Sequence, residues 1–375
     1  MKRKHISAII ILIGALIVTF YSGRMFLSMY QEEPIVTGPG VSSVVKLSTY
    51  FPGLEGSYGD TDVYIMKGRE PGGSTLVLGG THPNEPAAYI ASVVLIENVV
   101  VKKGTLYVIP RSNRSAFTHN DPQEGAPQRF YIETPFGERW FRFGSRATNP
   151  VHQWPDPDVY IHAASGQQLS GSETRNLNRG YPGRADGTFT EQVCYAIRNM
   201  INTEGIDLSI DLHEASPEYP VINAIVAHER AMPIAADVAI TMQSNEVNIG
   251  LEPSPVNLRG LTHRELGDST ETFAVLMESA NASQGRLRGR TDEALVLSGV
   301  DPMYEKAADL GRLFVPYDEN GHPLEVRVAR HLFGIESFII SMSSYDGNKA
   351  MIVSEIPSYQ NMVSRGVGAY LLPVE

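Results

Sequence analysis

Cysteine is nearly absent from this sequence: Cys194 is the only one among 375 residues. A single cysteine excludes an intrachain disulfide and leaves no second thiolate for a cysteine-based metal site. Because it falls on the apolar face of an expected helix over residues 190–201, we interpret Cys194 as a core residue. The length and the 42% hydrophobic content suffice for one large core or for two domains.

Positive charge is also scarce. Lysine and arginine together number 31, against 42 aspartate and glutamate residues, which gives a formal net charge of −11. No basic stripe runs along the sequence, so we expect no nucleic-acid partner. The sequence contains no internal repeat, and it has no transmembrane segment after Gly299.

An uncharged apolar run of 18 residues, Ile6 to Gly23, follows the basic residues 2–4. Its length is sufficient for a membrane-spanning helix, although at the short end of the range. Basic residues before a span keep the N-terminus in the cytoplasm and place the rest of the chain outside. The end of the run is a poor signal-peptidase site, which favours an uncleaved anchor over a cleaved secretory signal. We therefore expect a membrane anchor over residues 1–30 and a linker over residues 31–44.

Three side chains indicate a metal site. His82 and Glu85 lie in the run Gly-Gly-Thr-His-Pro-Asn-Glu, and His213 lies in Asp-Leu-His-Glu. Two imidazoles and one carboxylate are a typical ligand set for a catalytic zinc, with the fourth position left to water. Such a zinc ion lowers the pKa of its water and polarises a carbonyl group. We predict one zinc ion per chain at these residues.

The expected secondary structure places these side chains at strand ends. Three runs resemble short buried strands that end at or just before a candidate side chain: residues 75–79 before His82, 206–213 at His213 and 273–277 before Glu278. A helix is expected over residues 85–99. In open α/β sheets, ligands bind at the carboxyl ends of the strands. The pattern therefore predicts one site that all three side chains share.

Four short motifs occur in the order found in a known family: G-G-T-H-x-N-E at 79–85, N-R at 178–179, D-L-H at 211–213, and E followed by Q-G at 278–285. Over about residues 60–300 the sequence resembles the succinylglutamate desuccinylase and aspartoacylase family, within the zinc carboxypeptidase clan. We therefore expect an α/β fold, with a mixed twisted sheet and helices on both faces, preceded by an N-terminal transmembrane helix.

The resemblance implies a role for each remaining motif residue. Glu278 is expected to be the general base and then the acid that protonates the leaving nitrogen. Asn178 and Arg179 are expected to hold the carboxylate of the substrate, since a guanidinium group can grip a carboxylate with two parallel hydrogen bonds. Asp211 is expected to orient an imidazole or an arginine, or else to be a structural loop acid.

The sequence departs from the family pattern in two places. Asn176 stands where relatives usually carry aspartate, so the charge is lost there. Residues 115–172 form a long insert rich in proline, glycine and aromatic side chains, and long irregular segments in compact domains are usually functional or disordered. In relatives of the desuccinylase branch, the segment before the Asn-Arg pair is short and carries the arginine that stabilises the oxyanion. We assign that role to Arg146, with Arg142 and Arg175 as alternatives.

After residue 300 the pattern becomes helical. Helices are expected over residues 304–313 and 324–342. Candidate core positions on the second helix are Val326, Val328, Leu332, Ile335 and Phe338. We expect residues 45–300 to form the catalytic core, and residues 301–375 to complete its fold or to form a small appendage.

These expectations describe a membrane-tethered, zinc-dependent hydrolase that cleaves an amide bond next to a free carboxylate. The substrate is expected to be an N-acyl amino acid, which the Gln284-Gly285 motif favours. The alternative is a carboxypeptidase outside the cytoplasm that acts on peptides or cell-wall fragments, which the tether favours. A second alternative is a non-catalytic binding protein that retains the fold.

Overall fold

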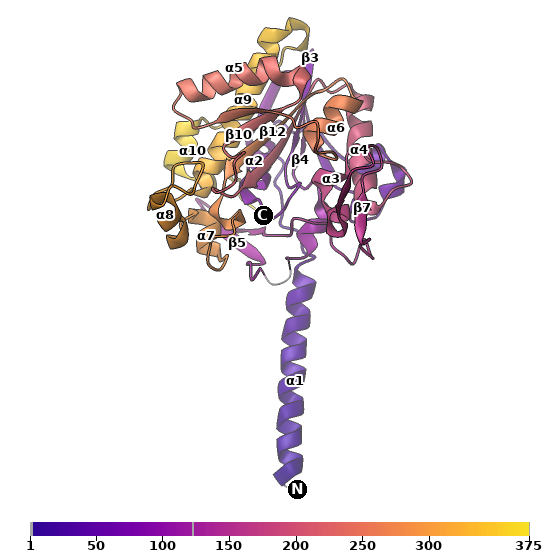
Figure 1. Cartoon of the computed structure of the whole chain (residues 1–375), viewed down its shortest axis with the longest axis vertical. Helices are drawn as coiled ribbons and strands as arrows, with labels where there is room; N and C mark the ends of the chain where they lie inside the picture. Colours follow the sequence, from indigo (N-terminus) through magenta and orange to yellow (C-terminus); the bar gives the residue numbers. More distant parts are fainter. Residues whose placement is uncertain (1–2, 122–123, 375) are drawn as a thin grey trace.

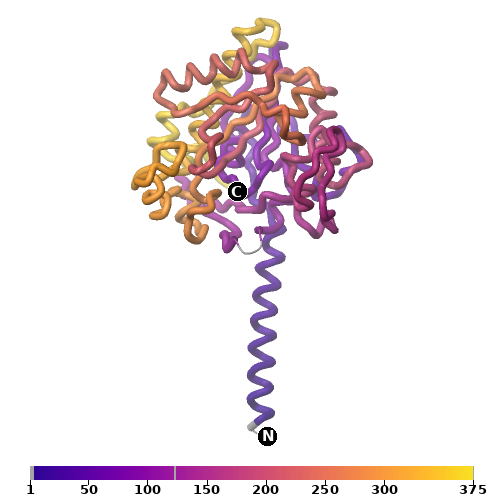
Figure 2. Tube along the Cα trace, in the orientation of Figure 1, coloured from indigo at the N-terminus to yellow at the C-terminus, as the bar shows by residue number. Residues whose placement is uncertain are grey.

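The computed structural model describes residues 3–121 and 124–374. Lys2, part of the expected basic start, and two positions of the expected insert lie outside these residues. Helix α1 (Arg3–Ser28) projects alone from a rounded body that contains the rest of the chain (Figure 1, Figure 2). From Lys4 to Ser28 its mean hydropathy is 2.3 and none of the apolar stretch is buried in the protein. This helix is long and apolar enough to cross a membrane.

Nine strands form one mixed sheet in the described part of the chain. From one edge to the other they are β1 (Ser43–Lys46), β2 (Asp62–Lys67), β4 (Val100–Ile109), β3 (Glu70–Leu78), β9 (Leu208–Ala215), β12 (Phe273–Ala280), β10 (Ala224–Ala227) and β11 (Gly250–Pro253), with β13 (Ile352–Ser354) paired to β4. The central strands β4, β3, β9 and β12 are parallel, and antiparallel pairs flank them. The predicted mixed α/β fold is confirmed.

Helices cover both faces of the sheet (Figure 1). One layer contains α2 (Pro86–Asn98), α5 (Met232–Ser244) and α9 (Leu324–Tyr345), and the other contains α4 (Phe189–Glu204) and α6 (Thr262–Ser269). Successive side chains of a strand point to opposite faces. Ile210 of β9 packs into the α2 layer, so Asp211 and His213 point to the opposite face. Cys194 is buried on α4, in the core of that second layer.

The C-terminal part of the chain packs into the same core as the sheet. Short helices α7 (Glu293–Ser298), α8 (Pro302–Asp309) and α10 (Tyr359–Arg365) accompany α9, which contacts both α2 and α5. Four of the expected core positions on α9 are fully buried: Val328, Leu332, Ile335 and Phe338. The prediction for Val326 is wrong, because that side chain is only partly buried. The face of α9 that points inward there carries Arg327 instead.

The segment after α1 is docked on the body. The Arg111 guanidinium donates to the backbone oxygen of Glu33 at 2.6 Å and lies 3.5 Å from its buried carboxylate. Farther on, the amide of Gly38 donates to the oxygen of Ile96 at the end of α2. The first strand begins at Ser43, inside the range expected for the linker. Residues 31–42 therefore form a packed connection to the sheet.

The described part of the long insert contains two small hairpins. They pair β5 (Arg129–Thr134) with β6 (Gly137–Arg142), and β7 (Val159–Ile161) with β8 (Gln168–Ser170). The short helix α3 (Leu177–Gly180) follows and carries the Asn-Arg motif. Residues of the insert line one side of the large cavity described below, so the insert forms part of its rim.

Candidate active site

Two glycines after β3 create the bend that carries the first candidate ligands. Gly80 has a φ of +60°, in the left-handed region that favours glycine. A Cβ there would lie 2.6 Å from the backbone oxygen of Pro110, so a larger residue would also clash. The turn continues with a hydrogen bond from the Glu85 amide to the His82 oxygen at 2.9 Å. This turn directs the side chains of His82 and Glu85 to the same side.

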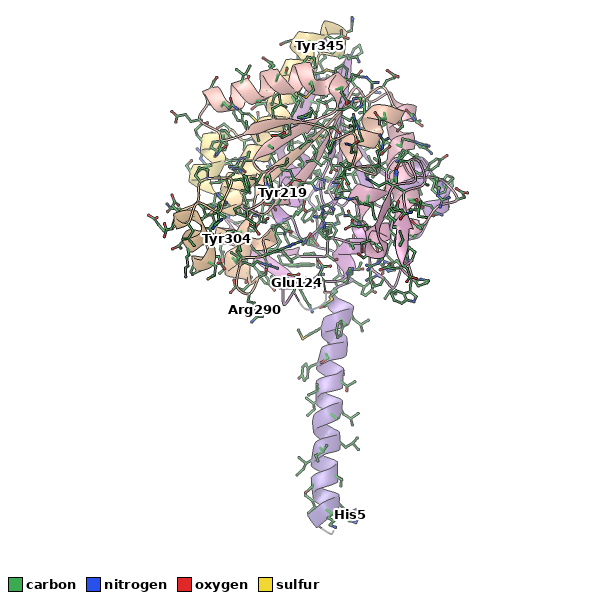
Figure 3. All side chains as sticks on the ribbon, in the orientation of Figure 1. His5, Glu124, Tyr219, Arg290, Tyr304 and Tyr345 are labelled. Carbon is green, nitrogen blue, oxygen red and sulfur yellow. The ribbon has the colours of Figure 1, made fainter. Side chains whose placement is uncertain are left out.

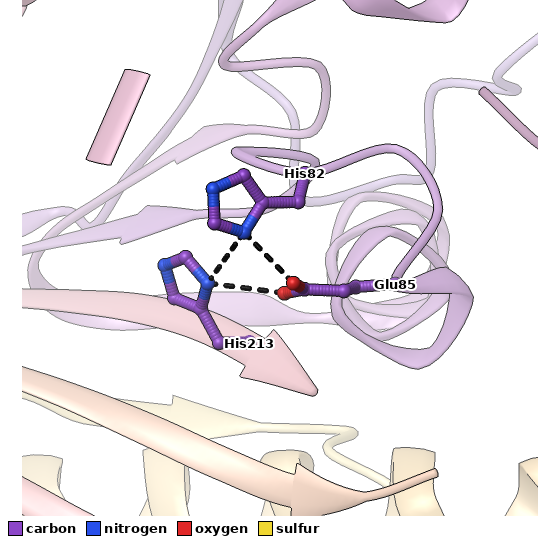
Figure 4. A group of neighbouring side chains, drawn as sticks. All are labelled: His82, Glu85 and His213. Atoms are coloured by element: carbon purple, nitrogen blue, oxygen red, sulfur yellow. Dashed lines mark hydrogen bonds and ion pairs between the residues drawn. The ribbon is translucent and has the colours of Figure 1, made fainter. Parts of the chain in front are cut away.

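The three predicted ligands meet at one buried point (Figure 4). His82 Nδ1 lies 2.8 Å from Glu85 Oε1, and His213 Nδ1 lies 3.0 Å from Glu85 Oε2. The two Nδ1 atoms are 3.2 Å apart. Residues from two separate motifs therefore supply three ligand atoms to one small volume.

The other ring nitrogen of His82 is held by Asn176. His82 Nε2 lies 2.9 Å from Asn176 Oδ1. The amide orientation of Asn176 is set by its neighbours, since Nδ2 donates to Glu173 at 2.7 Å and Oδ1 accepts from the amide of Asn178. An amide oxygen only accepts hydrogen bonds, so Nε2 of His82 carries the proton. The lone pair of neutral His82 is consequently on Nδ1, which faces the other ligands.

His213 is oriented in the same manner by a carboxylate. Its Nε2 donates to Asp211 Oδ2 at 2.8 Å, and Asp211 Oδ1 accepts from the Thr81 hydroxyl at 2.7 Å. Asp211 and His213 share one face of β9, as expected from their spacing. Although burial opposes ionisation of Glu85, the adjacent His82 and His213 hold its pKa well below the usual range. Although burial opposes it, Asp211 and Glu85 raise the pKa of His213, so this imidazole holds a proton that a metal ion would replace. With that proton displaced, the centre offers two imidazole nitrogens and one carboxylate.

This donor set fits a zinc ion. Neutral imidazole nitrogen and carboxylate oxygen are the usual ligands of a catalytic zinc with an open position. Two nitrogen lone pairs that face each other at 3.2 Å repel unless a cation or a proton lies between them. The outer contacts to Asn176 and Asp211 are of the kind that orients metal-binding histidines in other proteins.

Glu278 lies beside this centre. Strand β12 pairs with β9 in parallel, and the register places Glu278 directly opposite His213. Its Oε2 atom is buried and has no hydrogen-bond partner among the described residues. Burial, with a smaller contribution from Glu85, raises the pKa of Glu278 to about 8. A carboxyl group with a pKa near neutrality can both accept and return a proton.

Among the three arginines considered for the oxyanion, Arg146 reaches the centre. Its Nη1 lies 3.1 Å from Glu85 Oε1 and 3.3 Å from Nδ1 of His82. The guanidinium of Arg142 is buried and donates to backbone oxygens of the insert. Arg175 forms a two-pronged ion pair with Asp156, at 2.7 and 2.9 Å. The geometry thus favours Arg146 over the two alternatives.

Asn178 and Arg179 make different kinds of contact. The side-chain oxygen of Asn178 accepts from the amide and the hydroxyl of Thr262, so it fixes the first turn of α6. Arg179 lines the cavity and lies 3.8 Å from Glu173. Burial lowers the pKa of the Arg179 guanidinium from its ordinary value. Arg179 is thus a cation in the cavity wall, beside the centre.

One large cavity connects these residues. Its volume is about 1350 Å³. The lining includes His213, Glu278, Arg146, Arg179, Tyr219 and Arg288. Tyr219, labelled near the middle of the body in Figure 3, is about half exposed, so the cavity opens to the surface near it.

Sequence reasoning missed the part played by Glu214. Its amide donates to Glu85 Oε2 at 3.0 Å, while its own carboxylate accepts from the Ala87 amide at 2.7 Å. Burial raises the pKa of Glu214, and Arg327 opposes this shift from 2.7 Å away. The position next to His213 was visible in the sequence. Its partner Arg327 lies on α9, far along the chain, and could not be inferred.

A second missed contact joins two of the motifs. Asn84 Nδ2 donates to Gln284 Oε1 at 3.2 Å, and Gln284 Nε2 donates back to the backbone oxygen of Asn84. Both residues were visible as motif positions, but the sequence gave no reason to pair them. The pair joins the loop that carries His82 and Glu85 to the loop that follows Glu278.

No protein-family model matches this chain, and no curated protein gives a significant match. Among solved structures, the chain is similar to a metallo-carboxypeptidase from Burkholderia cenocepacia, with 13% identity, a TM-score of 0.47, and coverage of 86% of this chain and 68% of that chain. It is also similar to a succinylglutamate desuccinylase from Silicibacter sp. TM1040, with 16% identity, a TM-score of 0.36, and coverage of 70% and 64%.

An aspartoacylase family protein from Mesorhizobium loti shows similarity at the same level, with 16% identity, a TM-score of 0.36, and coverage of 62% of this chain and 64% of that chain. The present chain thus spans less than two thirds of the desuccinylase and aspartoacylase chains. A desuccinylase and an aspartoacylase family protein, two members of the family that the sequence resembles, are thus among the structures to which the chain is similar.

Proposed function

We propose that this chain is a zinc-dependent hydrolase that cleaves an amide bond next to a free carboxylate. The observation that carries the proposal is the convergence of His82, Glu85 and His213 on one buried point, with Glu278 opposite His213 in the sheet register. His82, Glu85 and His213 would hold a zinc ion, which would acidify a bound water and polarise the scissile carbonyl.

Glu278 moves the proton in this scheme. Glu278 lines the cavity, and its buried Oε2 has no hydrogen-bond partner among the described residues, so this carboxylate is available to accept a proton from the attacking water. The same oxygen then protonates the nitrogen of the departing amine. A pKa near neutrality suits both steps, because the carboxyl group has to gain and lose the proton at the same pH.

Two arginines recognise charge on the substrate. Arg146 reaches the ligand atoms from the cavity rim, where its guanidinium can donate to the oxygen that becomes negative in the transition state. Arg179 lies in the wall of the same cavity and can hold a free carboxylate with two parallel hydrogen bonds. With these two roles, the enzyme would cleave an amide bond that lies next to a free carboxylate of the substrate.

The size of the substrate separates two versions of this activity. The motif resemblance favours an N-acyl amino acid, which is a small molecule. The cavity volume of about 1350 Å³ exceeds the roughly 300–1000 Å³ of ordinary small-molecule pockets, which favours a peptide or cell-wall fragment. Both versions require the same metal site and the same carboxylate recognition, so they differ only in what fills the outer cavity.

We further propose that α1 anchors the enzyme in a membrane, with the body outside the cytoplasm. The support is the apolar stretch Lys4–Ser28 and the basic residues that precede it. The alternative is a cleaved signal and a secreted enzyme. Carbonate washing should leave the full chain in the membrane, whereas release of a soluble protein beginning near Arg24 would contradict the anchor.

The function is tested with the full chain in detergent. Metal analysis should find about one zinc per chain. A panel of N-acyl amino acids and short peptides, each as the free acid and as the amide, should show hydrolysis of the free acids. The matched control is Glu278→Gln, which should retain zinc without turnover. A wild-type protein that holds zinc and hydrolyses nothing would support the non-catalytic binding alternative.

A further inference from the structure

A short basic loop lies at the edge of the cavity. The run Arg-Leu-Arg-Gly-Arg occupies residues 286–290, directly after the Gln284-Gly285 motif. Arg286 and Arg290 are exposed, and the apolar Leu287 between them is 38% exposed. Neither arginine forms an ion pair with any described residue, whereas the central Arg288 pairs with Glu124. The loop therefore presents two free positive charges and an aliphatic side chain to its surroundings.

This loop lies beside the end of α1. Arg290 Nε donates to the backbone oxygen of Gly125 at 3.4 Å. A few residues later, Arg129 donates to the backbone oxygen of Ser28, the last residue of α1, and to the side chain of Gln31. Figure 3 shows Arg290 and Glu124 at the end of the body from which α1 emerges.

The body is fixed to α1 by packed contacts. Glu32 accepts from Arg114 Nε at 2.5 Å, next to the Glu33–Arg111 contact. Tyr30 packs edge-on against Tyr58, with ring centroids 5.6 Å apart. These contacts order the residues that follow the helix, so the basic loop stays on the side of the body that faces the helix.

The length of α1 determines where residues 286–290 lie relative to the bilayer surface. The 25 residues from Lys4 to Ser28 span roughly 37 Å at about 1.5 Å per residue. The hydrocarbon core of a bilayer is about 30 Å thick. If the apolar stretch crosses that core, Ser28 lies in the headgroup layer, and the loop beside it lies at the same surface.

We propose that residues 286–290 bind the headgroups of an anionic bilayer, with Arg286 and Arg290 on lipid phosphates and Leu287 in the interface. The proposal rests on the membrane anchor proposed above. Clustered arginines next to a membrane span are attracted by anionic lipid, and an aliphatic side chain adds apolar contact. Because Arg286 and Arg288 also line the cavity, the contact would hold the cavity rim against the bilayer surface.

The test uses the full chain in vesicles and a fluorophore on the loop. The native Cys194 is buried, so Gly289→Cys supplies the reactive thiol, and the space beside Gly289 is open apart from Asp301. The probe is quenching by brominated lipid, in phosphatidylcholine vesicles and in vesicles with about one third phosphatidylglycerol. We expect quenching at least about twofold stronger in the anionic vesicles, since the contact is electrostatic.

Two charge-reversal variants complete the test. Arg286→Glu/Arg290→Glu should lose the extra quenching in anionic vesicles. Lys67→Glu/Arg69→Glu changes the net charge equally and should keep the extra quenching. These two exposed residues lie at the end of β2 and in the turn before β3, and β3 begins at the far end of the body from α1 (Figure 1).

Equal quenching in neutral and anionic vesicles, or unchanged quenching in the Arg286→Glu/Arg290→Glu protein, would overturn the proposal. Release of the chain by carbonate would overturn it together with the anchor. Zinc content and hydrolysis are measured on the same samples. Failure of the hydrolase assignment is therefore distinguishable from failure of the lipid contact.

Discussion

Arg327 of α9 donates through Nη1 to Glu214 Oε1 at 2.7 Å, and both side chains are fully enclosed by the protein. The other carboxylate oxygen of Glu214 accepts from the Ala87 amide at the start of α2, directly after the proposed ligand Glu85. A helix near the C-terminus thereby supports the turn that holds two proposed zinc ligands.

Breaking this pair should cost both stability and metal affinity. Arg327→Met leaves a carboxylate buried without its partner, which typically costs about 3–5 kcal/mol of unfolding free energy. Urea unfolding and zinc titration of the full chain would measure the two effects. The double variant Glu214→Gln/Arg327→Met should recover part of the stability, because no unpaired charge remains. A single variant as stable as the wild type would contradict this account.

The metal site should respond in a graded manner to changes at the centre. His213→Ala removes a proposed ligand and should abolish most zinc binding. Asn176→Ala keeps all three ligands but frees Nε2 of His82 and removes the cap of α3. Loss of such an orienting contact commonly lowers metal affinity about 10–100-fold. Competition with a chelator would give both affinities. Arg365→Ala, at an exposed position at the end of α10, serves as the control. Full zinc retention by His213→Ala would refute the ligand assignment.

Arg146 should act on the rate rather than on substrate binding. A contact that is made only in the transition state lowers kcat when lost and leaves KM nearly unchanged. We expect Arg146→Ala to lower kcat by on the order of 100-fold or more. Steady-state kinetics would show this, with the exposed Arg365→Ala as the matched control. A normal kcat in Arg146→Ala, with a collapse in Arg175→Ala, would transfer the role to Arg175.

Glu278 and Arg179 should fail in different ways. Glu278→Gln keeps the size of the side chain but cannot accept a proton, so kcat should fall by roughly a hundredfold or more while zinc and KM are retained. Arg179→Ala should mainly raise KM for the free acid. It should matter little for a substrate whose carboxylate is a neutral amide. Kinetics on matched acid and amide substrates separate the two, and a fully active Glu278→Gln would refute the mechanism.

The fold should lose stability in mild acid partly because of His322. Burial lowers its pKa to about 4, and its Nε2 donates to the oxygen of Pro316. The nearby charges are Arg330, Arg327 and Asp318. The folded state thus holds His322 neutral. The contribution of neutral His322 to the free energy of unfolding is complete above the ordinary pKa of about 6.5. It is lost as the pH falls from there through 4, by at most about 3.4 kcal/mol.

Urea unfolding of the full chain between about pH 7 and pH 4 would measure this effect. His322→Gln can keep the hydrogen bond to Pro316 without a proton to gain, so its stability should fall less steeply over that range. Other histidines, among them His119, His263 and His331, also have pKa values lowered by burial and should leave a residual slope. Identical slopes for the variant and the wild type would exclude a role for His322.

The sequence predicted the parts of the site that depend on local pattern. Short apolar runs marked the strands β3, β9 and β12, and the alternation of side chains placed Asp211 and His213 on one face. Parallel strands bring their carboxyl ends to one edge of the sheet, so motifs far apart in the sequence could be expected to meet. The roles of the motif residues stay predictions until they are tested.

The sequence could not predict contacts that depend on tertiary packing. Helical spacing on α9 pointed to Val326, whereas the fold buries Arg327 because Glu214 is there to pair with it. A single chain likewise gave no sign that Glu33 would be enclosed beside Arg111. In both cases an acidic and a basic side chain are buried together as an ion pair. The spacing of hydrophobic residues in the sequence does not reveal such pairs.

The docked segment after α1 limits where the cavity can lie relative to a membrane. A flexible linker would let the body sample a volume that grows with the length of the linker. This segment is instead held against the body by the contacts of Glu32 and Glu33 with arginines. With α1 in a bilayer, the height of the cavity above the lipid is a constant of the fold. The enzyme would then search for substrate in two dimensions, by lateral diffusion, and would reach only amides presented within one thin layer at that height.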